Sequence, residues 1–379
     1  MSRCPNLHVG KARDYSRLPH GLSRRDDTAP CATLDGELVR CYPSHNGVDL
    51  AVKVTERVRA ERHGSIEGVF TENAVLKASA NQPHPNLLAS YSASNMFAAA
   101  PGTLVSITPW LDGGELFCVL EAACNAGEYM PLQDVLRYTM DVVSGVAHLH
   151  TRLGYAHLDI SPENVMLHSA SGGDAPHAVV VDFGCAAAIG DDGIAPVTRR
   201  GKDFYMAPEV QIATSPVTID ATRADVYSIG VMLLVLLTGR TPPSAWLRRK
   251  SECDLAKELA SHWPERCGSG RAELIASMVS ANPASRPTLK EVASHRGLAW
   301  LQQDASVEAG TQVLEAGAGA GAEVGGGAGA GAGAGAGSVI GGVAGNNDLG
   351  DDIIGSDELL LAFIREVPSP QPAGAHQEV

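Results

Sequence analysis

Short apolar runs separated by polar stretches predict a chain that combines strands and helices. Residues 179–181 (three valines) have the length and the β-branched content of a buried strand. A longer apolar run at residues 231–237 predicts an apolar helix. This run is far too short to span a bilayer.

A different pattern begins after residue 300. From about residue 317 to 345 the chain is almost only Gly and Ala, which cannot bury a core and predicts a flexible linker. Residues 356–367 then predict a short helix, which Ser356 can cap and Pro368 ends. Its apolar residues recur at i, i+3, i+4 and i+7: Leu360, Phe363, Ile364 and Val367. A helix this short is marginal alone, so either it docks on the rest of the chain or on a partner, or the tail is disordered.

The most informative polar segment is residues 157–164, His-Leu-Asp-Ile-Ser-Pro-Glu-Asn. It resembles the catalytic loop of protein kinases, H-R-D-L-K-P-E-N, with Asp159 and Asn164 at the family's separation. Phosphoryl transfer depends on positioning and charge stabilisation more than on covalent help. The resemblance implies that Asp159 accepts or orients a hydroxyl proton. It also implies that Asn164 holds Mg²⁺ through its side-chain oxygen.

The valine run ends in Asp182-Phe183-Gly184, 18 residues after Asn164 (182 − 164). This tripeptide resembles the D-F-G motif, whose Asp binds the Mg²⁺ that bridges the nucleotide phosphates. The resemblance therefore makes Asp182 the second metal ligand. Residues 201–209, Gly-Lys-Asp-Phe-Tyr-Met-Ala-Pro-Glu, resemble the G-T-x-x-Y-M-A-P-E end of a kinase activation segment.

Paired charges complete the family pattern. Lys53 resembles the Lys of the V-A-I-K strand, which binds the α- and β-phosphates, and Glu72 resembles the helix Glu that forms an ion pair with that Lys. Asp225 resembles the Asp that braces the catalytic-loop backbone from a long helix. Arg286 resembles the Arg that pairs with the Glu of A-P-E, here Glu209.

Residues 107–116 resemble the hinge that connects the two lobes of a kinase, with Thr108 at the gatekeeper position. Pro109 has no N–H to give to adenine. The resemblance therefore assigns the hinge donor to Leu111. Glu115 stands where many kinases meet the ribose or a basic residue of the substrate.

The motifs follow the family's order over roughly residues 31–300. The resemblance implies an α+β, bilobal protein-kinase-like fold, with a small antiparallel-sheet N-lobe that holds one key helix and a larger, mainly helical C-lobe. ATP is expected between the lobes. The expected divisions are a polar extension at 1–30, the N-lobe at 31–109, the hinge at 109–112, the C-lobe at 113–300 and an acidic, Gly/Ala-rich tail at 301–379.

The phosphate-binding loop departs from the family. Counting back from Lys53, Gly36 falls on the third glycine of G-x-G-x-x-G, but the first two positions hold Cys31 and Thr33. Side chains with a Cβ keep the backbone from approaching phosphates closely. We therefore expect a weakened grip on the nucleotide.

Two further departures concern charge. Leu158 replaces the Arg that receives the activation-loop phosphate in many kinases, so we expect activation without phosphorylation of Thr198. Ser161 replaces a Lys that neutralises the transferring phosphoryl group, and Lys202 stands where the family usually has Thr. Our hypothesis is that Lys202 supplies the missing ammonium; the alternative is a surface Lys.

The resemblance implies an ATP- and Mg²⁺-dependent protein kinase. Pro-Glu-Asn after Ser161 is typical of kinases that act on Ser or Thr. The first alternative is a weak or inactive pseudokinase that acts as a binding scaffold, but the base, both metal ligands and the Lys–Glu pair are present. A second alternative, a small-molecule kinase of related fold, is disfavoured by residues 205–209, which resemble a segment for protein substrates.

The net charge of −14 is concentrated in the tail, where one Arg and eleven acids from residue 301 onward give 1 − 11 = −10. This acidity argues against nucleic acid as a main partner. No apolar run resembles a signal peptide or a membrane span, so we expect a cytoplasmic protein without a membrane partner, with the nucleus left open. Eight Cys residues without a CxxC pair indicate free thiols. Cys185 is either a thiol accessible to electrophiles or a packed residue.

Overall fold

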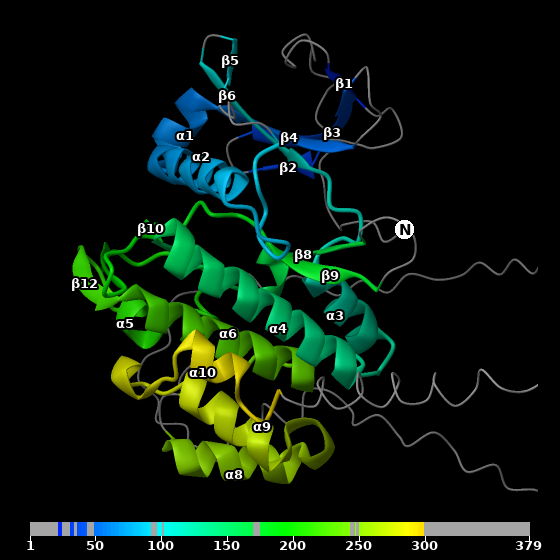
Figure 1. Cartoon of the computed structure of the whole chain (residues 1–379), viewed down its shortest axis with the longest axis vertical. Coiled ribbons are helices and arrows are strands. Elements are labelled where there is room, and N and C mark those ends of the chain that lie inside the picture. Colours follow the sequence, from blue (N-terminus) through cyan, green and yellow to red (C-terminus); the bar gives the residue numbers. More distant parts are fainter. Residues whose placement is uncertain are drawn as a thin grey trace, which may run out of the picture.

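The chain forms two lobes, a sheet-rich one at the top of Figure 1 and a helical one below it. The structure is a computed structural model, and it describes residues 22–24, 31–33, 36–43, 49–91, 97–100, 102–169, 175–242, 247 and 250–298. The Gly/Ala-rich stretch and the predicted helix at residues 356–367 lie outside these described residues.

The upper lobe is built on an antiparallel sheet in which β1, β3, β4, β6 and β5 follow in that order and β2 pairs with β3. The strand around Lys53 that the family resemblance implied, residues 51–54, lies within β4. Alternation along β4 buries Val52 in the sheet core and turns Lys53 to the other face, because successive side chains of a strand point in opposite directions. The strands are β1 (Leu22–Arg24), β2 (Cys31–Ala32), β3 (Gly36–Pro43), β4 (Leu50–Glu56), β5 (Phe97–Ala100) and β6 (Thr103–Pro109).

The sheet begins earlier than the sequence predicted. Strand β1 pairs with β3 in the register Leu22 to Pro43 and Arg24 to Cys41. Part of the predicted extension, Leu22–Arg24, therefore pairs with the sheet, which the sequence did not indicate. Three residues are too few to show a two-residue alternation, and an edge strand draws its pairing from β3, about twenty residues further along the chain.

Two helices lie beside the sheet, α1 (Arg57–His63) and α2 (Ile66–Asn81). Among the described residues of this lobe, α2 is the one long helix, as the family resemblance implied. It buries Val75 and Leu76 against the lower lobe's core cluster and carries Glu72. The position of α2 therefore decides whether Glu72 can reach the sheet.

The lower lobe packs its helices around α6 (Ala221–Thr238), which contains the apolar run at residues 231–237 that was predicted to be helical. By length and composition alone α6 could cross a membrane, but 89% of its apolar window is buried inside this lobe. That burial is what a core helix of a folded domain requires. The other helices are α3 (Leu116–Asn125), α4 (Leu132–His148), α5 (Pro208–Gln211), α8 (Glu252–His262), α9 (Pro264–Met278) and α10 (Leu289–Ala293).

Short strand pairs position the loops that carry polar residues between the lobes. The predicted strand at residues 179–181 overlaps β9, which ends at Val180 just before Asp182. The antiparallel pairs are β8 (Val165–His168) with β9 (His177–Val180), β7 (Tyr155–Ala156) with β10 (Ala187–Ala188), and β11 (Ile194–Val197) with β12 (Val217–Asp220).

Candidate active site

A buried carboxylate, that of Asp225 in α6, holds the start of the loop 157–164. Asp225 of α6 is fully buried, and its two oxygens accept the backbone N–H groups of His157 and Leu158, each at 2.7 Å. Leu158 has a φ of 61°, in the left-handed region that disfavours side chains with a Cβ by roughly 1–2 kcal/mol. The two bonds to Asp225 stabilise this backbone and fix the direction of the residues that follow.

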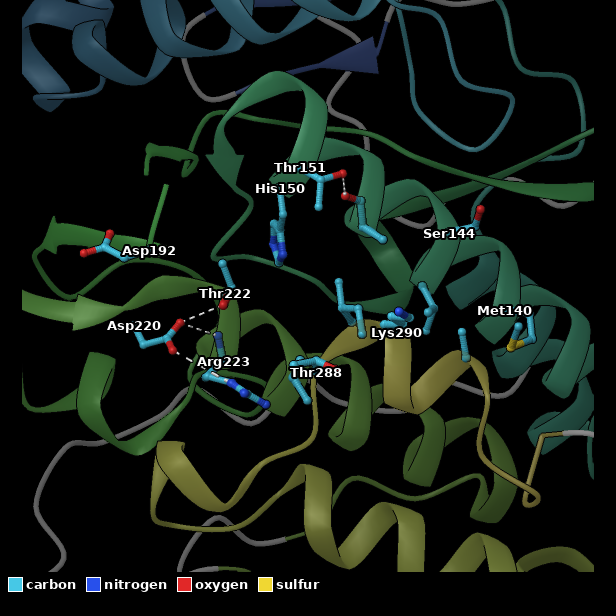
Figure 2. Close-up of a pocket in the computed structure, with 15 residues that line it drawn as sticks. Met140, Ser144, His150, Thr151, Asp192, Asp220, Thr222, Arg223, Thr288 and Lys290 are labelled. Atoms are coloured by element: carbon cyan, nitrogen blue, oxygen red, sulfur yellow. Dashed lines mark hydrogen bonds and ion pairs between the residues drawn. The ribbon is translucent and has the colours of Figure 1, made fainter. Parts of the chain in front are cut away.

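His150 also binds Asp225, through Nε2 at 2.8 Å from Oδ2. It comes from the π-helical turn at Leu149–Leu153 and lines a pocket between α4, α6 and α10 (Figure 2). Sequence analysis missed His150, because nothing in its own neighbourhood shows that it shares a carboxylate 75 residues away.

Three donors converge on the carboxylate of Asp159. The side-chain amide of Asn164 donates to Oδ2 at 2.7 Å, the backbone N–H of Lys202 donates to Oδ1 at 2.8 Å, and the Lys202 ammonium lies 3.3 Å from Oδ2. Asn164 also donates to the Asp159 backbone carbonyl at 2.7 Å. The carboxylate predicted as the base is therefore fixed in orientation from two segments of the chain.

The Lys202 ammonium also donates to the Ser161 hydroxyl at 2.9 Å. The two positions at which the sequence departs from the family thus lie in direct contact. Gly201 permits the approach, because its φ is +92° and a Cβ there would lie 2.4 Å from the Leu158 carbonyl oxygen. The hypothesis that Lys202 supplies the missing ammonium requires its side chain to lie beside the catalytic loop, and the contact with Ser161 meets this requirement.

Asn164 and Asp182 offer the hard oxygen ligands that Mg²⁺ prefers. Because the Asn164 amide nitrogen is engaged by Asp159, its side-chain oxygen is left to accept. The Val181 N–H donates to the Asn164 carbonyl at 3.0 Å, which places Asp182 one residue from that link. Within the described part of the chain, no group of three or more His, Cys, Asp or Glu residues could hold a metal ion by itself. A metal here must share its remaining ligands with phosphates and water, which fits Mg²⁺.

Asp182 stays ionised. Protein atoms packed around the Asp182 carboxyl displace water, and this desolvation favours the protonated form of the carboxyl. The residue as a whole still has an exposed surface. The positive charge of Lys53 and the Gly184 N–H, 3.3 Å from Oδ1, outweigh that effect and lower the pKa of Asp182. An ionised Asp182 is the form that can bind a cation.

The predicted ion pair between Lys53 and Glu72 is formed, with Nζ 2.6 Å from Oε2. Strand β4 supplies Lys53, and α2 supplies Glu72, which is buried. Burial raises the pKa of Glu72, the Lys53 charge lowers it in part, and Asp182 raises it further. The pair therefore tethers α2 to the sheet, at a carboxylate that is easier to protonate than an ordinary Glu.

The hinge residues lie at the end of β6. Thr108 is buried and pairs with Ala51 of β4. The Trp110 N–H donates to the Asp49 carbonyl at 3.0 Å, so it is engaged within the protein. For the Leu111 N–H, the described residues provide no backbone or side-chain acceptor, and this N–H is the donor that the sequence assigned to the nucleotide.

Gly36 has a reason of its own to lack a side chain. It lies in β3 opposite Thr55, and a Cβ there would come within 1.7 Å of the Val54 carbonyl oxygen. Close packing of β3 on β4 thus accounts for this glycine without any phosphate. Nearby, the buried Thr33 hydroxyl has no partner among the described residues.

Glu115 and Glu163 form a pair of neighbouring carboxylates. Burial raises the pKa of Glu115, and the charge of Glu163 raises it further against the opposing effect of Lys202. Glu163 Oε2 is buried and finds no hydrogen-bond donor among the described residues. Sequence analysis singled out Glu115 but not Glu163, whose place inside the Pro-Glu-Asn motif gave no sign that its carboxylate faces Glu115.

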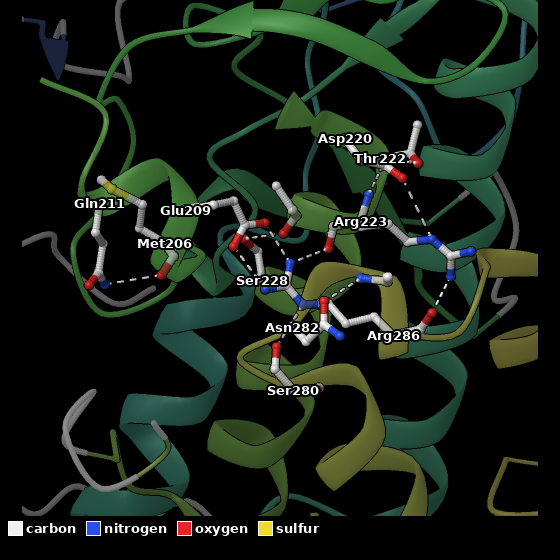
Figure 3. A network of polar contacts seen from close by, with 12 residues as sticks. Met206, Glu209, Gln211, Asp220, Thr222, Arg223, Ser228, Ser280, Asn282 and Arg286 are labelled. Carbon is white, nitrogen blue, oxygen red and sulfur yellow. Dashed lines mark hydrogen bonds and ion pairs between the residues drawn. The ribbon is translucent and has the colours of Figure 1, made fainter. Parts of the chain in front are cut away.

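Glu209 and Arg286 join the activation segment to the lower lobe, as the resemblance implied (Figure 3). Two parallel bonds link the guanidinium to the carboxylate, at 2.7 and 2.8 Å. Arg286 also donates to the carbonyls of Ser280 and Arg223, and its own carbonyl accepts from Arg223. Four of the five N–H donors of this buried guanidinium are thereby engaged, which fixes where the activation segment leaves the site.

Cys185 follows Asp-Phe-Gly but is not an activated thiol. Burial raises its pKa to about 11, and the charges of Asp159 and Asp182 act in the same direction. A thiol with this pKa is protonated at neutral pH. The packed reading of Cys185 is therefore favoured.

Comparison with known proteins agrees with this geometry. Residues 35–298 match the family model described as the protein kinase domain. CBL-interacting protein kinase 9 of Oryza sativa is 29% identical over 255 residues, which are 66% of this chain and 50% of the relative. CBL-interacting serine/threonine-protein kinase 3 of Arabidopsis thaliana is 29% identical over 267 residues, 69% of this chain and 54% of the relative. Serine/threonine-protein kinase CHK1 of Saccharomyces cerevisiae is 32% identical over 197 residues, 51% of this chain and 34% of the relative.

This chain spans about half the length of the two plant kinases and about a third of the yeast kinase. The family match covers more than half of the chain itself, and it coincides with the two lobes. Fold, motif order and family match agree, and the chain belongs to the protein kinase family.

Proposed function

We propose that this chain is a protein serine/threonine kinase that transfers the γ-phosphoryl group of ATP to a protein hydroxyl. The observation that carries the proposal is the Asp159 carboxylate, which is fixed by Asn164 and Lys202 in the orientation a base needs. The formed pair of Lys53 with Glu72 supports it, because a phosphate-binding ammonium is held in place. Relatives whose names describe them as serine/threonine kinases support the same substrate class.

Each residue has a defined part in the proposed reaction. Lys53 binds the α- and β-phosphates, and the Leu111 N–H orients the adenine. Asn164 and Asp182 hold Mg²⁺, which when bound neutralises charge on the phosphates. Asp159 orients the acceptor hydroxyl and takes its proton. These assignments rest on general kinase chemistry applied to the geometry of this site.

Lys202 is proposed to provide the positive charge that the family usually supplies from the position of Ser161. Its ammonium is 2.9 Å from the Ser161 hydroxyl and 3.3 Å from Asp159, so it reaches the same place from the activation segment. A positioned cation beside the reacting phosphoryl group stabilises charge that develops in the transition state.

The substrate is proposed to carry a basic residue near the acceptor hydroxyl. The buried Glu163 oxygen has no donor among the described residues, and the neighbouring Glu115 carboxylate adds a second negative charge. A guanidinium or ammonium from a protein substrate would satisfy both carboxylates. The ribose role of Glu115 is the alternative.

A scaffold without catalytic activity is the second candidate. Cys31 and Thr33 favour it, since they place side chains where the phosphate loop of the family has glycines. Magnesium-ATP turnover with a generic protein substrate tests the choice, with Asp182→Asn as the inactive variant and the exposed Glu128→Gln as the matched control. If the chain is an active kinase, turnover should be lost in Asp182→Asn and kept in Glu128→Gln. If Asp182→Asn gives the same signal as the unsubstituted protein, the signal is not kinase turnover and the scaffold is favoured.

A further inference from the structure

A pocket of about 650 Å³ lies between the second half of α4, the start of α6, and α10 (Figure 2). Its lining is mainly apolar and includes Val143, Ala147, Val226, Leu289 and Ala293. None of the residues assigned to phosphoryl transfer lines it. Its volume lies in the usual range for ligand pockets, roughly 300–1,000 Å³.

The pocket continues into a second hollow of about 550 Å³. The two share His150, Thr151, Asp192 and Thr222, and the second follows the turn at residues 150–154 and the loop at 189–193. Together they form an elongated groove with an apolar half and a polar half. This shape suits a short helix with one apolar face better than a compact small molecule.

We propose that residues 356–367 of the same chain dock in this groove as an amphipathic helix. The groove lies where the tail begins, because α10 forms one wall and the described chain ends at Leu298, five residues after Ala293 (298 − 293). The intervening stretch 299–355 contains 57 residues (355 − 298). The flexible linker that the composition predicts would have a root-mean-square span of roughly 40 Å at that length, which would keep the segment at high local concentration.

The chemistry of the two surfaces is complementary. Four residues of the segment form one apolar stripe, which matches the apolar half of the groove: Leu360, Phe363, Ile364 and Val367. Docking would bury this stripe and supply the stability that so short a helix lacks alone.

Charge sets the direction of docking. The segment begins with Asp357 and Glu358, in a tail of net charge −10 (1 − 11). The exposed Lys290 belongs to α10 and lies near the middle of the pocket in Figure 2, between Asp192 on one side and Met140 on the other. The acidic start of the segment therefore lies near Lys290.

The groove touches the support of the catalytic loop. His150 lines both hollows and binds Asp225, which holds the backbone of residues 157 and 158. The proposed docking does not depend on kinase activity, so an experiment that detects contact can test it separately from the proposed function.

Photo-cross-linking of the full chain tests the proposal. Benzoylphenylalanine replaces Phe363 in one variant and Arg365 in a control variant, since residue 365 lies about 200° around the helix from 363 at 100° per residue. We expect the probe at 363 to label peptides from α4 or α10, and the probe at 365 to label them much less. Labels elsewhere in the chain, or none, would overturn the proposal.

Mixing ¹⁵N-labelled with unlabelled chains separates self-docking from a second copy. Cross-linked peptide pairs that are both light or both heavy support docking within one chain, and mixed pairs overturn it. Lys290→Glu should lower the cross-link yield roughly two- to fivefold, as for one exposed charge pair, and Asp357→Lys with Glu358→Lys should restore it. The exposed Lys257→Glu on α8 is the matched control and should leave the yield unchanged. A yield that Lys290→Glu does not alter would contradict the proposed direction.

Discussion

The Lys202 ammonium donates a hydrogen bond to the Ser161 hydroxyl at 2.9 Å. One residue comes from the activation segment and the other from the catalytic loop, 41 positions apart (202 − 161). The usual family arrangement has Lys in the loop and Thr in the segment. Here the polar pair is exchanged while the contact between the two positions is kept.

Removing the Lys202 ammonium should slow phosphoryl transfer. Lys202→Ala is expected to lower kcat about 10²- to 10³-fold, because one electrostatic donor to the transition state is lost. The double variant Ser161→Lys with Lys202→Thr should recover much of the rate, since it returns the cation from the other side. Steady-state kinetics on purified protein measure both, and Lys257→Ala on α8 controls for loss of a surface charge. Unchanged kcat in Lys202→Ala would show that Lys202 has no part in transfer.

Glu72→Gln should change how the free energy of unfolding depends on pH. The pKa of Glu72 is raised above its ordinary 4.5, mainly by burial, so the folded protein binds this proton more tightly than the unfolded chain does. The resulting stabilisation is present below 4.5 and is lost as the pH rises through the raised pKa. The free energy of unfolding of the wild type should therefore fall relative to Glu72→Gln as the pH rises, in urea titrations at a series of pH values.

The same substitution should lower activity at neutral pH, because an uncharged Gln holds Lys53 less firmly than the 2.6 Å ion pair does. The acid limb of the wild-type pH profile should lie above the pKa of an ordinary Glu. A stability difference between the two proteins that does not vary with pH would refute this account of Glu72.

Thr198→Ala should leave turnover essentially unchanged. Leu158 occupies the position of the usual phosphate-binding Arg, and it is buried in the core of the lower lobe, where it offers no charge. Kinase assays on protein with and without phosphatase treatment measure the effect. The idea fails if Thr198→Ala abolishes activity while the thermal unfolding transition stays intact. A phosphate on Thr198 would still meet Arg200, whose Nη2 lies 3.2 Å from the Thr198 hydroxyl, and that contact makes the experiment informative.

Arg286→Ala should destabilise the lower lobe strongly. Removing one partner of a buried ion pair leaves an uncompensated charge, here Glu209, at a cost of about 3–5 kcal/mol. Arg296→Ala is the matched control, because its pair with Glu273 leaves the two side chains 70% and 52% exposed. An exposed pair contributes only ~0–1 kcal/mol. Urea unfolding of both variants measures the contrast, and equal midpoints would show that the Arg286 network adds little.

The sequence was most informative where several functional residues share one short motif. Asp159 and Asn164 could be assigned because the family motif keeps both within one loop, and in the structure the Asn164 amide donates to the Asp159 carboxylate. Asp182 could be placed because an apolar strand leads directly into it. In both cases the information lies within a few residues.

Contacts between distant segments were harder to predict. Nothing near β1 shows that it joins the sheet, since the pairing is specified by β3. The bond of His150 to Asp225 and the closeness of Glu163 to Glu115 depend likewise on how separate elements pack. The contact between Lys202 and Ser161 was an exception. It could be anticipated because both residues depart from the family motifs, one by losing a Lys and the other by gaining one.

The Asp225 carboxylate has a consequence for motion. The amide hydrogens of residues 157 and 158 bond to a side chain near the start of α6, the helix at the centre of the lower lobe. A loop held only by its neighbours exchanges these hydrogens with solvent through small local openings, whereas here exchange requires α6 to release them. These two loop amides should therefore exchange as slowly as amides of the helical core, and the base at Asp159 keeps its position for as long as the lobe remains folded.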